Sequence, residues 1–387
     1  MKHKHYTQFF VFIEICLTIF LLTALLAGCE RKEPVKIGFT GCLTGRLSDL
    51  GTAGRNGTML AVEQINGAGG INGLPVELLV RDDKNKAEAA LKADQELIGE
   101  GVSAIIGHVT SSMCLAALPV INDNRIVMIS PTASSDKLTG LDDYFFRVCP
   151  DNNAQTIYLA RHTVEKMKLN RLSLVYDLSN PAYSERVYKL FRDTFKGLGG
   201  EVLLTETFTS GKNASYFDIS ERLLKDQPQG VFIVAGAMDT AMICQHLRKI
   251  NPDLPIISSG WALAPALLQP GGKAVEGVIF SHSLDEKSND KQFLEFKKQY
   301  VQRFGNAPEH PAGIFAYEAA QLLFTILAET KEPKDIKPAI LKQKSFQGLQ
   351  GKLHIDPFGD VQRNYFIVTV KDGEFITINT SEEQKTD

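Results

Sequence analysis

The sequence predicts an α/β fold of two similar lobes, each a mainly parallel sheet doubly wound with helices. Apolar strand-like runs alternate with segments of helical periodicity along the 387-residue chain, which is the pattern of βαβ units. The alternation restarts after residue 150 with no intervening linker, so we expect two lobes that share one cleft. Only the end switches to a period of two, where Tyr365–Val370 and Phe375–Ile378 flank the turn Lys371-Asp372-Gly373 as a hairpin.

Residues 1–28 are typical of a signal peptide. Glu14 interrupts an apolar stretch and leaves a run of about 13 residues, against the roughly 20 that a membrane-spanning helix needs. The stretch ends in Leu26-Ala27-Gly28-Cys29, which resembles the lipobox of bacterial lipoproteins. We therefore expect cleavage before Cys29, lipid on its thiol, a tether over 29–34 and a mature domain in the periplasm or at the cell surface. The alternative is an uncleaved anchor helix.

The first half of the mature chain is expected to form alternating strands and helices. The helix expected at 54–66 places Leu60, Val62 and Ile65 on or near one face and ends before Gly67. The other elements expected here are the strands 35–40, 76–80, 104–107, 126–130 and 145–148 and the helices 87–98 and 111–121.

The second half repeats the series. The helix expected at 184–198 ends at the pair Gly199 and Gly200, and the polar tail 380–387 follows the final hairpin. The remaining elements are the helices 156–167, 216–224, 240–250, 290–304 and 312–330 and the strands 172–176, 202–207, 231–235, 255–258 and 277–280.

Composition excludes several functional classes. Hydrophobic residues make up 44% of the chain, which excludes intrinsic disorder, and a single long apolar stretch excludes a polytopic membrane protein. Lys+Arg 42 against Asp+Glu 45 leaves a net charge of −3, too little positive charge for a surface that coats nucleic acid.

Motifs for catalysis, cofactors and metals are missing from the sequence. Gly51-x-x-Gly54-x-x-Gly57 does not have dinucleotide-binding spacing, and no Walker motif, Gly-x-Ser-x-Gly or Cys-x-x-Cys occurs. We therefore expect a binding protein without a cofactor or metal, and not an enzyme. Apart from Cys16 in the signal region and the lipid site Cys29, four cysteines remain, for which buried free thiols are favoured and disulfides stay open: Cys42, Cys114, Cys149 and Cys244.

Two further polar features favour structural roles. Asp82-Asp83 ends a predicted strand, where a solvated strand end or a helix cap is favoured over a metal ligand. His108 follows another strand directly, which favours a packed histidine over one that orients a loop.

Hydroxyl side chains follow two consecutive predicted strands. Gly107–Ser112 runs from one strand into a helix N-terminus, and Ser130–Ser135 repeats the arrangement after the next strand. Helix N-termini favour anions, and ligands of open parallel sheets bind beyond the carboxyl ends of the strands. The two segments together predict a carboxylate site, with ordinary N-capping as the alternative.

The sequence as a whole resembles the leucine/isoleucine/valine-binding proteins, type I periplasmic binding proteins of ABC importers. The resemblance covers nearly all of the mature chain and thins after about residue 260. The motifs that carry it are Ile37-Gly-Phe-Thr-Gly41, Gly45, Gly51, Ala61-Val-Glu-Gln-Ile-Asn66, Gly69-Gly-Ile-Asn-Gly73, Asp82-Asp83, Ile106-Gly-His108 and Ile129-Ser-Pro131.

The resemblance implies ligand contacts in both lobes. Ser111, Thr132 and Ser134, the hydroxyl cluster, match the positions that hold an amino-acid carboxylate. Leu50 stands where the family has an aromatic residue of the first lobe, and Tyr183 matches a tyrosine of the second.

The position that pairs with the ligand ammonium departs from the family. Gly260 stands where the family has a glutamate. Asp239, just past a predicted strand, is the expected substitute, with helix capping as the alternative. The single tryptophan, Trp261, is expected as an aromatic wall of the ligand pocket.

The resemblance also implies a three-crossover hinge, with crossings near Pro150, Ser281 and Gly359. Lobe 1 would comprise 35–150 plus 282–359, and lobe 2 would comprise 151–281 plus 360–379. The implied function is the monomeric solute-binding component of an ABC importer, which docks on the permease complex. Its ligand would be an apolar, branched-chain or aromatic-like amino acid. Alternatives are a ligand-sensing receptor module of this fold and a protein that binds amine-free carboxylates such as aromatic acids.

Overall fold

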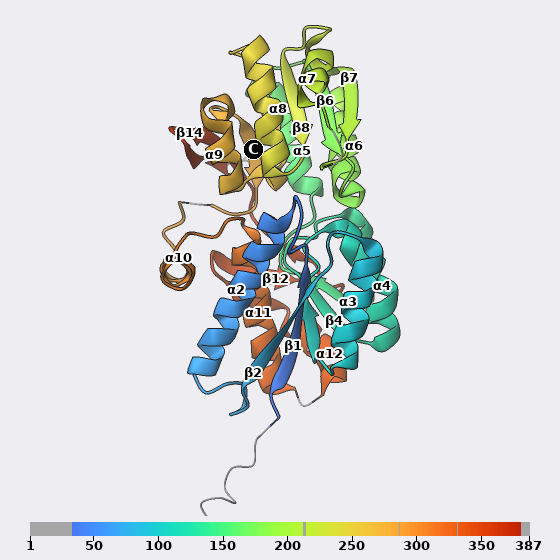
Figure 1. The fold of residues 1–387 in the computed structure, drawn as a ribbon, viewed down its shortest axis with the longest axis vertical. Coiled ribbons are helices and arrows are strands. Elements are labelled where there is room, and N and C mark those ends of the chain that lie inside the picture. Colours follow the sequence, from blue (N-terminus) through green and yellow to red (C-terminus); the bar gives the residue numbers. More distant parts are fainter. Residues whose placement is uncertain (1–32, 212–213, 286, 331, 381–387) are drawn as a thin grey trace, which may run out of the picture.

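Lobe 1 is built on a five-stranded parallel sheet with the strand order β2-β1-β3-β4-β5 (Figure 1). The computed structural model describes residues 33–211, 214–285, 287–330 and 332–380. The predicted signal peptide, Cys29, most of the tether and nearly all of the tail lie outside these residues. The strands are β1 Val35–Gly41, β2 Val76–Asp82, β3 Ala104–Ile106, β4 Val127–Ser130 and β5 Phe145–Arg147.

Helices cover both faces of this sheet. One face packs on α2 (Ser48–Gly67) and α11 (Ala312–Glu329), and the other on α3 (Ala87–Gly99) and α4 (Ser111–Asn124). The remaining elements of the lobe are α10 Lys291–Phe304, α12 Ile336–Gln343 and the antiparallel strands β11 Ser345–Gly348, β12 Gly351–Ile355 and β13 Val361–Gln362.

Lobe 2 is built on a seven-stranded sheet with the order β15-β14-β10-β9-β8-β6-β7. Five strands are parallel, and the C-terminal hairpin β14–β15 adds an antiparallel edge. The strands are β6 Arg171–Asp177, β7 Glu201–Phe208, β8 Gly230–Val234, β9 Ile256–Ser258, β10 Ile279–His282, β14 Phe366–Lys371 and β15 Glu374–Thr380.

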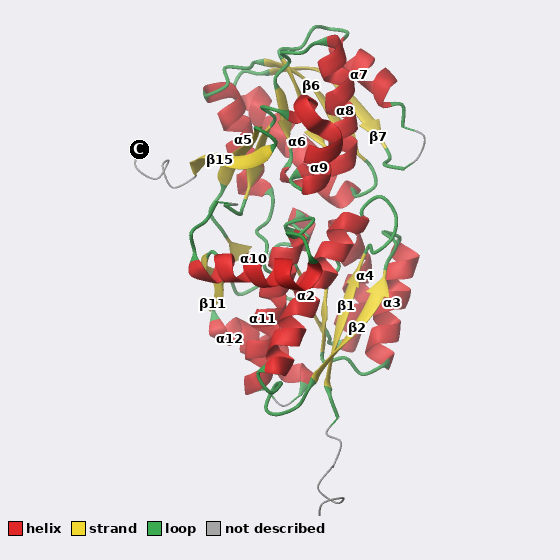
Figure 2. Cartoon of the chain, turned by 60° about the vertical axis from the view of Figure 1, so that its left-hand side comes forward, coloured by secondary structure: helices red, strands yellow, loops and turns green. Residues whose placement is uncertain are grey.

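Residues of β8 alternate between two apolar layers, as expected for a strand buried on both faces. Val231 and Ile233 pack in the layer of α7–α9, and Phe232 and Val234 in the layer of α5 and α6. Figure 2 labels the helices α5 to α9 of this lobe. The helices are α5 Asn153–Glu165, α6 Pro181–Gly197, α7 Tyr216–Leu224, α8 Ala237–Ile250 and α9 Pro265–Gly271.

The chain passes between the lobes three times, at 148–152, at 283–290 (residue 286 not described) and at 363–365. The third passage lies beyond Gly359 because β13 still pairs with β12 in lobe 1. Arg363 ties the first and third passages together, since its Nε donates to the Val148 carbonyl at 2.8 Å. This side-chain hydrogen bond therefore joins two of the three passages between the lobes.

The glycine repeat in α2 serves helix packing. A Cβ at Gly57 would lie 2.0 Å from the Gly313 carbonyl oxygen of α11, and a Cβ at Gly54 would lie 3.3 Å from side-chain atoms of Phe39 and Val109. Glycines spaced by three residues thus let α2 lie close against α11 and the sheet. Among the described residues, α11 alone is long and apolar enough to cross a membrane, and 72% of that stretch is buried, as in a core helix.

The predicted fold class of two parallel-sheet lobes is confirmed, and the predicted elements overlap observed ones. The prediction starts α2 six residues late, at Gly54 instead of Ser48, because polar and glycine residues open this helix. It omits α9, α12 and β11–β13. These elements have two to eight residues, too few for a periodicity to appear in the sequence.

Candidate ligand-binding site

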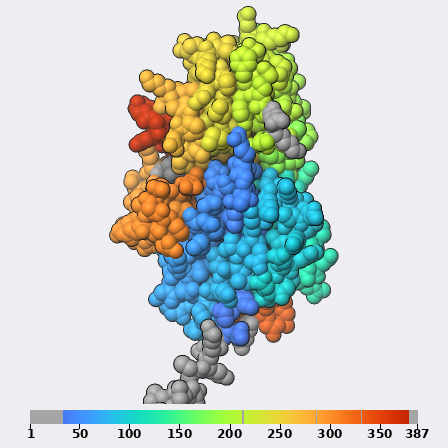
Figure 3. Space-filling model, viewed as in Figure 1, coloured from blue at the N-terminus to red at the C-terminus, as the bar shows by residue number. Residues whose placement is uncertain are grey.

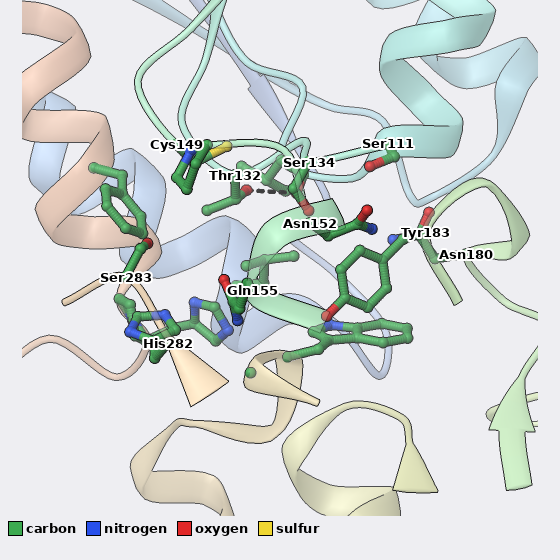
Figure 4. Close-up of a pocket in the computed structure, with 18 residues that line it drawn as sticks. Ser111, Thr132, Ser134, Cys149, Asn152, Gln155, Asn180, Tyr183, His282 and Ser283 are labelled. Carbon is green, nitrogen blue, oxygen red and sulfur yellow. Dashed lines mark hydrogen bonds between the residues drawn. The ribbon is translucent and has the colours of Figure 1, made fainter. Parts of the chain in front are cut away.

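A pocket lies in the cleft between the lobes, at the carboxyl ends of the sheet strands (Figure 4). Six of the seven residues predicted to contact a ligand line it: Leu50, Ser111, Thr132, Ser134, Tyr183 and Trp261. The seventh, Asp239, does not. The strand-end argument and the resemblance together therefore identified residues of both lobes that lie around one pocket.

The hydroxyl cluster sits on the lobe 1 wall, but its members differ in hydrogen bonding. Ser111 begins α4, and its Oγ accepts a hydrogen bond from the Ser135 N–H at 3.2 Å, so its own proton remains available. Thr132 instead donates its proton to the Val109 carbonyl at 2.6 Å. Ser111 is therefore a free donor at a helix N-terminus, where an anion is favoured, whereas Thr132 is occupied.

Two asparagines, Asn152 and Asn180, also line the pocket, and sequence reasoning missed both. Asn152 is 4% exposed, and neither its amide oxygen nor its amide nitrogen has a hydrogen-bond partner in the described residues. Asn180 of lobe 2 accepts a hydrogen bond from the Ser112 N–H of lobe 1 at 3.1 Å. The available signal for Asn152 was its place two residues after Pro150, at the first implied crossing.

Aromatic and aliphatic side chains form the rest of the wall. The rings of Tyr183 and Trp261 meet edge to face, with centroids 5.5 Å apart and an interplanar angle of 77°. Burial raises the pKa of Tyr183 to about 12, so the phenol stays protonated. Leu50 and Phe315 add apolar surface from lobe 1. This part of the pocket suits an apolar or aromatic ligand body.

None of the described residues that line the pocket is Asp, Glu, Lys or Arg. At Gly260, a Cβ would lie 2.7 Å from the Ser281 carbonyl oxygen and 2.9 Å from Nε2 of Gln155. The Gln155 amide donates to that same carbonyl. A neutral amide therefore fills the corner where the resemblance implied a carboxylate.

Asp239 lies outside this pocket, in an adjoining hollow, and its carboxylate has other partners. Oδ1 pairs with Nη2 of Arg46 at 2.7 Å and accepts from the Tyr216 hydroxyl, and Oδ2 accepts from the Ser210 hydroxyl at 2.6 Å. The expectation that Asp239 faces a ligand ammonium is thus not supported by its position. It makes no capping hydrogen bond for α8 either.

The ion pair between Arg46 and Asp239 joins the two lobes. A second contact also joins them, since Asn85 of lobe 1 donates to the Ser179 carbonyl of lobe 2 at 3.0 Å. The blue N-terminal part of lobe 1 meets the yellow-green surface of lobe 2 in the space-filling view (Figure 3). The lobes are therefore closed over the pocket.

A buried charged group supports the loops of the hydroxyl cluster. His108 is fully buried, with Nδ1 2.7 Å from Asp83 and Nε2 3.1 Å from Asp94. Burial alone would lower the pKa of His108, but the two carboxylates raise it to about 9. The backbone carbonyl of His108 accepts a hydrogen bond from the Ser130 hydroxyl at 2.6 Å. This bond connects His108 to the hydroxyl-bearing segment Ser130–Ser135. His108 is thus packed, as predicted, and also holds a loop.

The acidic pair Asp82-Asp83 makes hydrogen bonds that stabilise the surrounding loops. Asp82 accepts from the Leu43 N–H at 2.9 Å, while Asp83 holds His108. Across the described ranges, no group of three or more His, Cys, Asp or Glu side chains could hold a metal ion. The four cysteines within those ranges are buried free thiols, as favoured from the sequence: Cys42, Cys114, Cys149 and Cys244.

Comparisons with known proteins agree with this architecture. A family model described as "Periplasmic binding protein" matches residues 34–374. The Leu/Ile/Val/Thr/Ala-binding protein of Pseudomonas aeruginosa is 25% identical over 344 residues, covering 87% of this chain and 89% of the relative. The Leu/Ile/Val-binding protein of Escherichia coli K12 is 24% identical over 351 residues, covering 88% and 93%.

Solved structures share the two-lobed fold. A branched-chain amino acid transporter substrate-binding protein of Streptococcus pneumoniae, solved with isoleucine, superposes with a TM-score of 0.82 at 23% identity, covering 89% of this chain and 99% of that one. A solute-binding protein of an ABC transporter of R. palustris, solved with benzoate, gives 0.81 at 18%, covering 90% and 96%. The chain therefore belongs to the periplasmic binding protein family, a family of non-enzymatic, extracytoplasmic binding proteins, and is similar to its Leu/Ile/Val-binding members.

Proposed function

We propose that this protein delivers a small carboxylic acid with an apolar or aromatic body, and without an ammonium group, to an ABC importer. The observation that carries this proposal is the neutrality of the pocket: free hydroxyl and amide donors on one wall, aromatic rings on another, and no described acidic lining residue. Donors at a helix N-terminus stabilise an anion, and nothing in the pocket neutralises a cation.

The uptake of an amino acid is the second candidate. The names of the Pseudomonas aeruginosa and Escherichia coli relatives favour it, whereas the benzoate-bound neighbour has an amine-free ligand. An ammonium buried here without a carboxylate partner would cost several kcal/mol, because the charge would lose its water and gain no counter-ion. Asp239 does not offset this cost, since Arg46 already pairs with it.

A thermal-shift series of matched compounds tests the proposal on the mature protein. The series compares 3-phenylpropanoate with phenylalanine and with 3-phenylpropanamide, and 4-methylpentanoate with leucine. A ligand at 100 times its Kd adds about 2.7 kcal/mol of stability, so binding raises the midpoint measurably. We expect the acids to raise the thermal midpoint and 3-phenylpropanamide to raise it much less than 3-phenylpropanoate does. Larger shifts with phenylalanine or leucine than with their amine-free partners would favour the amino acid instead.

We also propose that Cys29 carries the lipid anchor, on the support of the lipobox-like Leu26-Ala27-Gly28-Cys29. A Cys29→Ser variant should lose its lipid and partition into the aqueous phase of a detergent extraction. A Cys16→Ser variant, altered inside the signal region, should be processed normally. An unchanged N-terminal mass in the Cys29→Ser variant would exclude the anchor.

A further inference from the structure

Two histidines, His282 and His310, line the pocket, and Figure 4 shows His282 on the side away from the hydroxyl cluster. His282 ends β10 at the second passage between the lobes, and His310 precedes α11 in lobe 1. Neither residue was singled out from the sequence. We refer to His282 and His310 together as the histidine pair.

Backbone contacts determine which ring nitrogen carries the proton. The Leu284 N–H donates to Nδ1 of His282 at 3.2 Å, and the Ala312 N–H donates to Nδ1 of His310 at 3.0 Å. A neutral imidazole that accepts at Nδ1 carries its proton on Nε2. Each ring therefore presents an Nε2–H donor.

The Nε2–H donor of His310 lies near the Trp261 backbone but has no hydrogen-bond partner of normal geometry among the described residues. This side chain is 6% exposed, and its Nε2 makes no hydrogen bond within the described part of the chain. A buried donor without a partner is costly and rare, so such a group in a ligand pocket points to a ligand atom that completes it.

The histidine pair is neutral at physiological pH. Burial lowers the pKa of His282 to about 3, with further lowering from His310 and Arg363. Burial lowers the pKa of His310 to about 4, and the interaction with the Trp261 backbone opposes this shift. Among the described residues, no acidic side chain lines the pocket beside them. Two neutral N–H donors suit an uncharged oxygen.

We propose that the histidine pair is a second recognition point, and that the transported acid carries a hydroxyl or carbonyl oxygen at the end opposite its carboxylate. This inference rests on the proposed function, because it assumes that the carboxylate binds at the hydroxyl cluster. The apolar walls of Leu50, Trp261 and Phe315 then contact the ligand body between its two polar ends. The substrate class is an oxygen-substituted apolar or aromatic carboxylic acid.

Calorimetric titration of the mature protein with substituted acids tests this inference. The probes are benzoate, phenylacetate and 3-phenylpropanoate, each unsubstituted, with a para-hydroxyl and with a para-methyl group of similar size. We expect one para-hydroxy acid to bind about tenfold more tightly than both of its analogues, because it completes a buried donor. Titration in two buffers of different ionisation enthalpy should show no proton uptake, since an uncharged oxygen leaves the imidazoles neutral.

A variant separates recognition from folding. His310→Asn keeps a side-chain acceptor for the Ala312 N–H and removes the Nε2 donor. In this variant the affinity of the para-hydroxy acid relative to its unsubstituted parent should fall to about one. The matched control is His246→Asn on α8, which is not among the residues that line the pocket. An unchanged thermal midpoint of the ligand-free variant confirms folding.

The outcomes are distinct. If parent acids bind but the para-hydroxyl brings no gain, or if the gain survives His310→Asn, the second recognition point is wrong and the proposed function stands. If amino acids bind and no amine-free acid does, the proposed function fails and this inference fails with it. Proton uptake with a tight ligand would mean that the histidine pair meets an anion, which contradicts the uncharged oxygen.

Discussion

At the residue scale, hydrogen bonding decides what each hydroxyl offers a ligand. Ser111 keeps its proton free because it accepts from the Ser135 N–H, whereas Thr132 gives its proton to the Val109 carbonyl. The sequence placed both at a strand end facing the cleft, and the structure agrees. Whether a hydroxyl proton is already used in a hydrogen bond depends on partners up to 24 residues away. A local sequence pattern does not include those partners.

The hydroxyl cluster should therefore contribute unequally to affinity. A hydrogen bond to a charged group is worth about 1.5–3 kcal/mol, so Ser111→Ala and Ser134→Ala should each weaken acid binding by about tenfold to a hundredfold. Thr132→Val should lower the thermal midpoint and change affinity by less than about threefold. Calorimetric titration of the three variants measures this order. Equal losses in all three would show that Thr132 also donates to the ligand.

His108 gives the folded state a pH dependence with a definite sign. Its pKa is about 9 when folded and near 6.5 in an unfolded chain, so the folded state binds the proton more tightly. Its contribution is fully present below pH 6.5 and is lost as pH rises to about 9. Denaturant titrations from pH 6 to 9.5 should show wild type losing more stability than Asp94→Asn, in which one carboxylate that holds the imidazolium is gone. Parallel pH profiles would contradict this assignment.

At the element scale, glycine spacing sets how closely helices approach. The repeat Gly51, Gly54 and Gly57 resembles a dinucleotide-binding motif only superficially. In the structure these glycines let α2 pack closely against neighbouring backbone and side chains. The periodicity of α2 and α11 was readable from the sequence because both helices bury an apolar face. Their pairing was not, because the contact joins residues more than 250 positions apart.

Two glycine substitutions in α2 test this packing. Gly57→Ala puts a methyl group 2.0 Å from the Gly313 carbonyl oxygen, and overpacking of this kind typically costs about 1–3 kcal/mol. Gly67→Ala, at the end of the same helix, has no neighbouring atom within 4 Å and is the matched control. The thermal midpoint should fall for Gly57→Ala and stay the same or rise for Gly67→Ala. Equal midpoints would mean that α2 and α11 can separate without cost.

At the scale of the whole molecule, the lobes meet through the ion pair of Arg46 and Asp239. The sequence located Asp239 correctly at a strand end near the cleft but missed its partner, which lies 193 residues earlier in the other lobe. The same limit applies to Asn180 and His310, because contacts between lobes follow from closure and not from local pattern. The two-lobed fold was predictable since each βαβ unit carries its own periodicity.

The interlobe ion pair should tune closure and not ligand selectivity. Asp239→Asn and Arg46→Gln should each weaken the binding of every ligand by a similar, several-fold factor. The effect stays modest because the Arg46 side chain is 42% exposed. Arg303→Gln, in an exposed ion pair with Glu63 inside lobe 1, should leave affinity unchanged. A loss confined to amine-bearing ligands in Asp239→Asn would instead make Asp239 a ligand contact.

The most direct test is a crystal structure of the mature protein with the amine-free acid that raises its thermal midpoint most. We expect the ligand carboxylate within hydrogen-bond distance of the Ser111 and Ser134 hydroxyls, the ligand body against Trp261 and Phe315, and the Arg46–Asp239 pair intact. A carboxylate bound elsewhere in the cleft would contradict the proposed site. A complex in which an amino-acid ammonium displaces Arg46 from Asp239 would overturn the proposed ligand class.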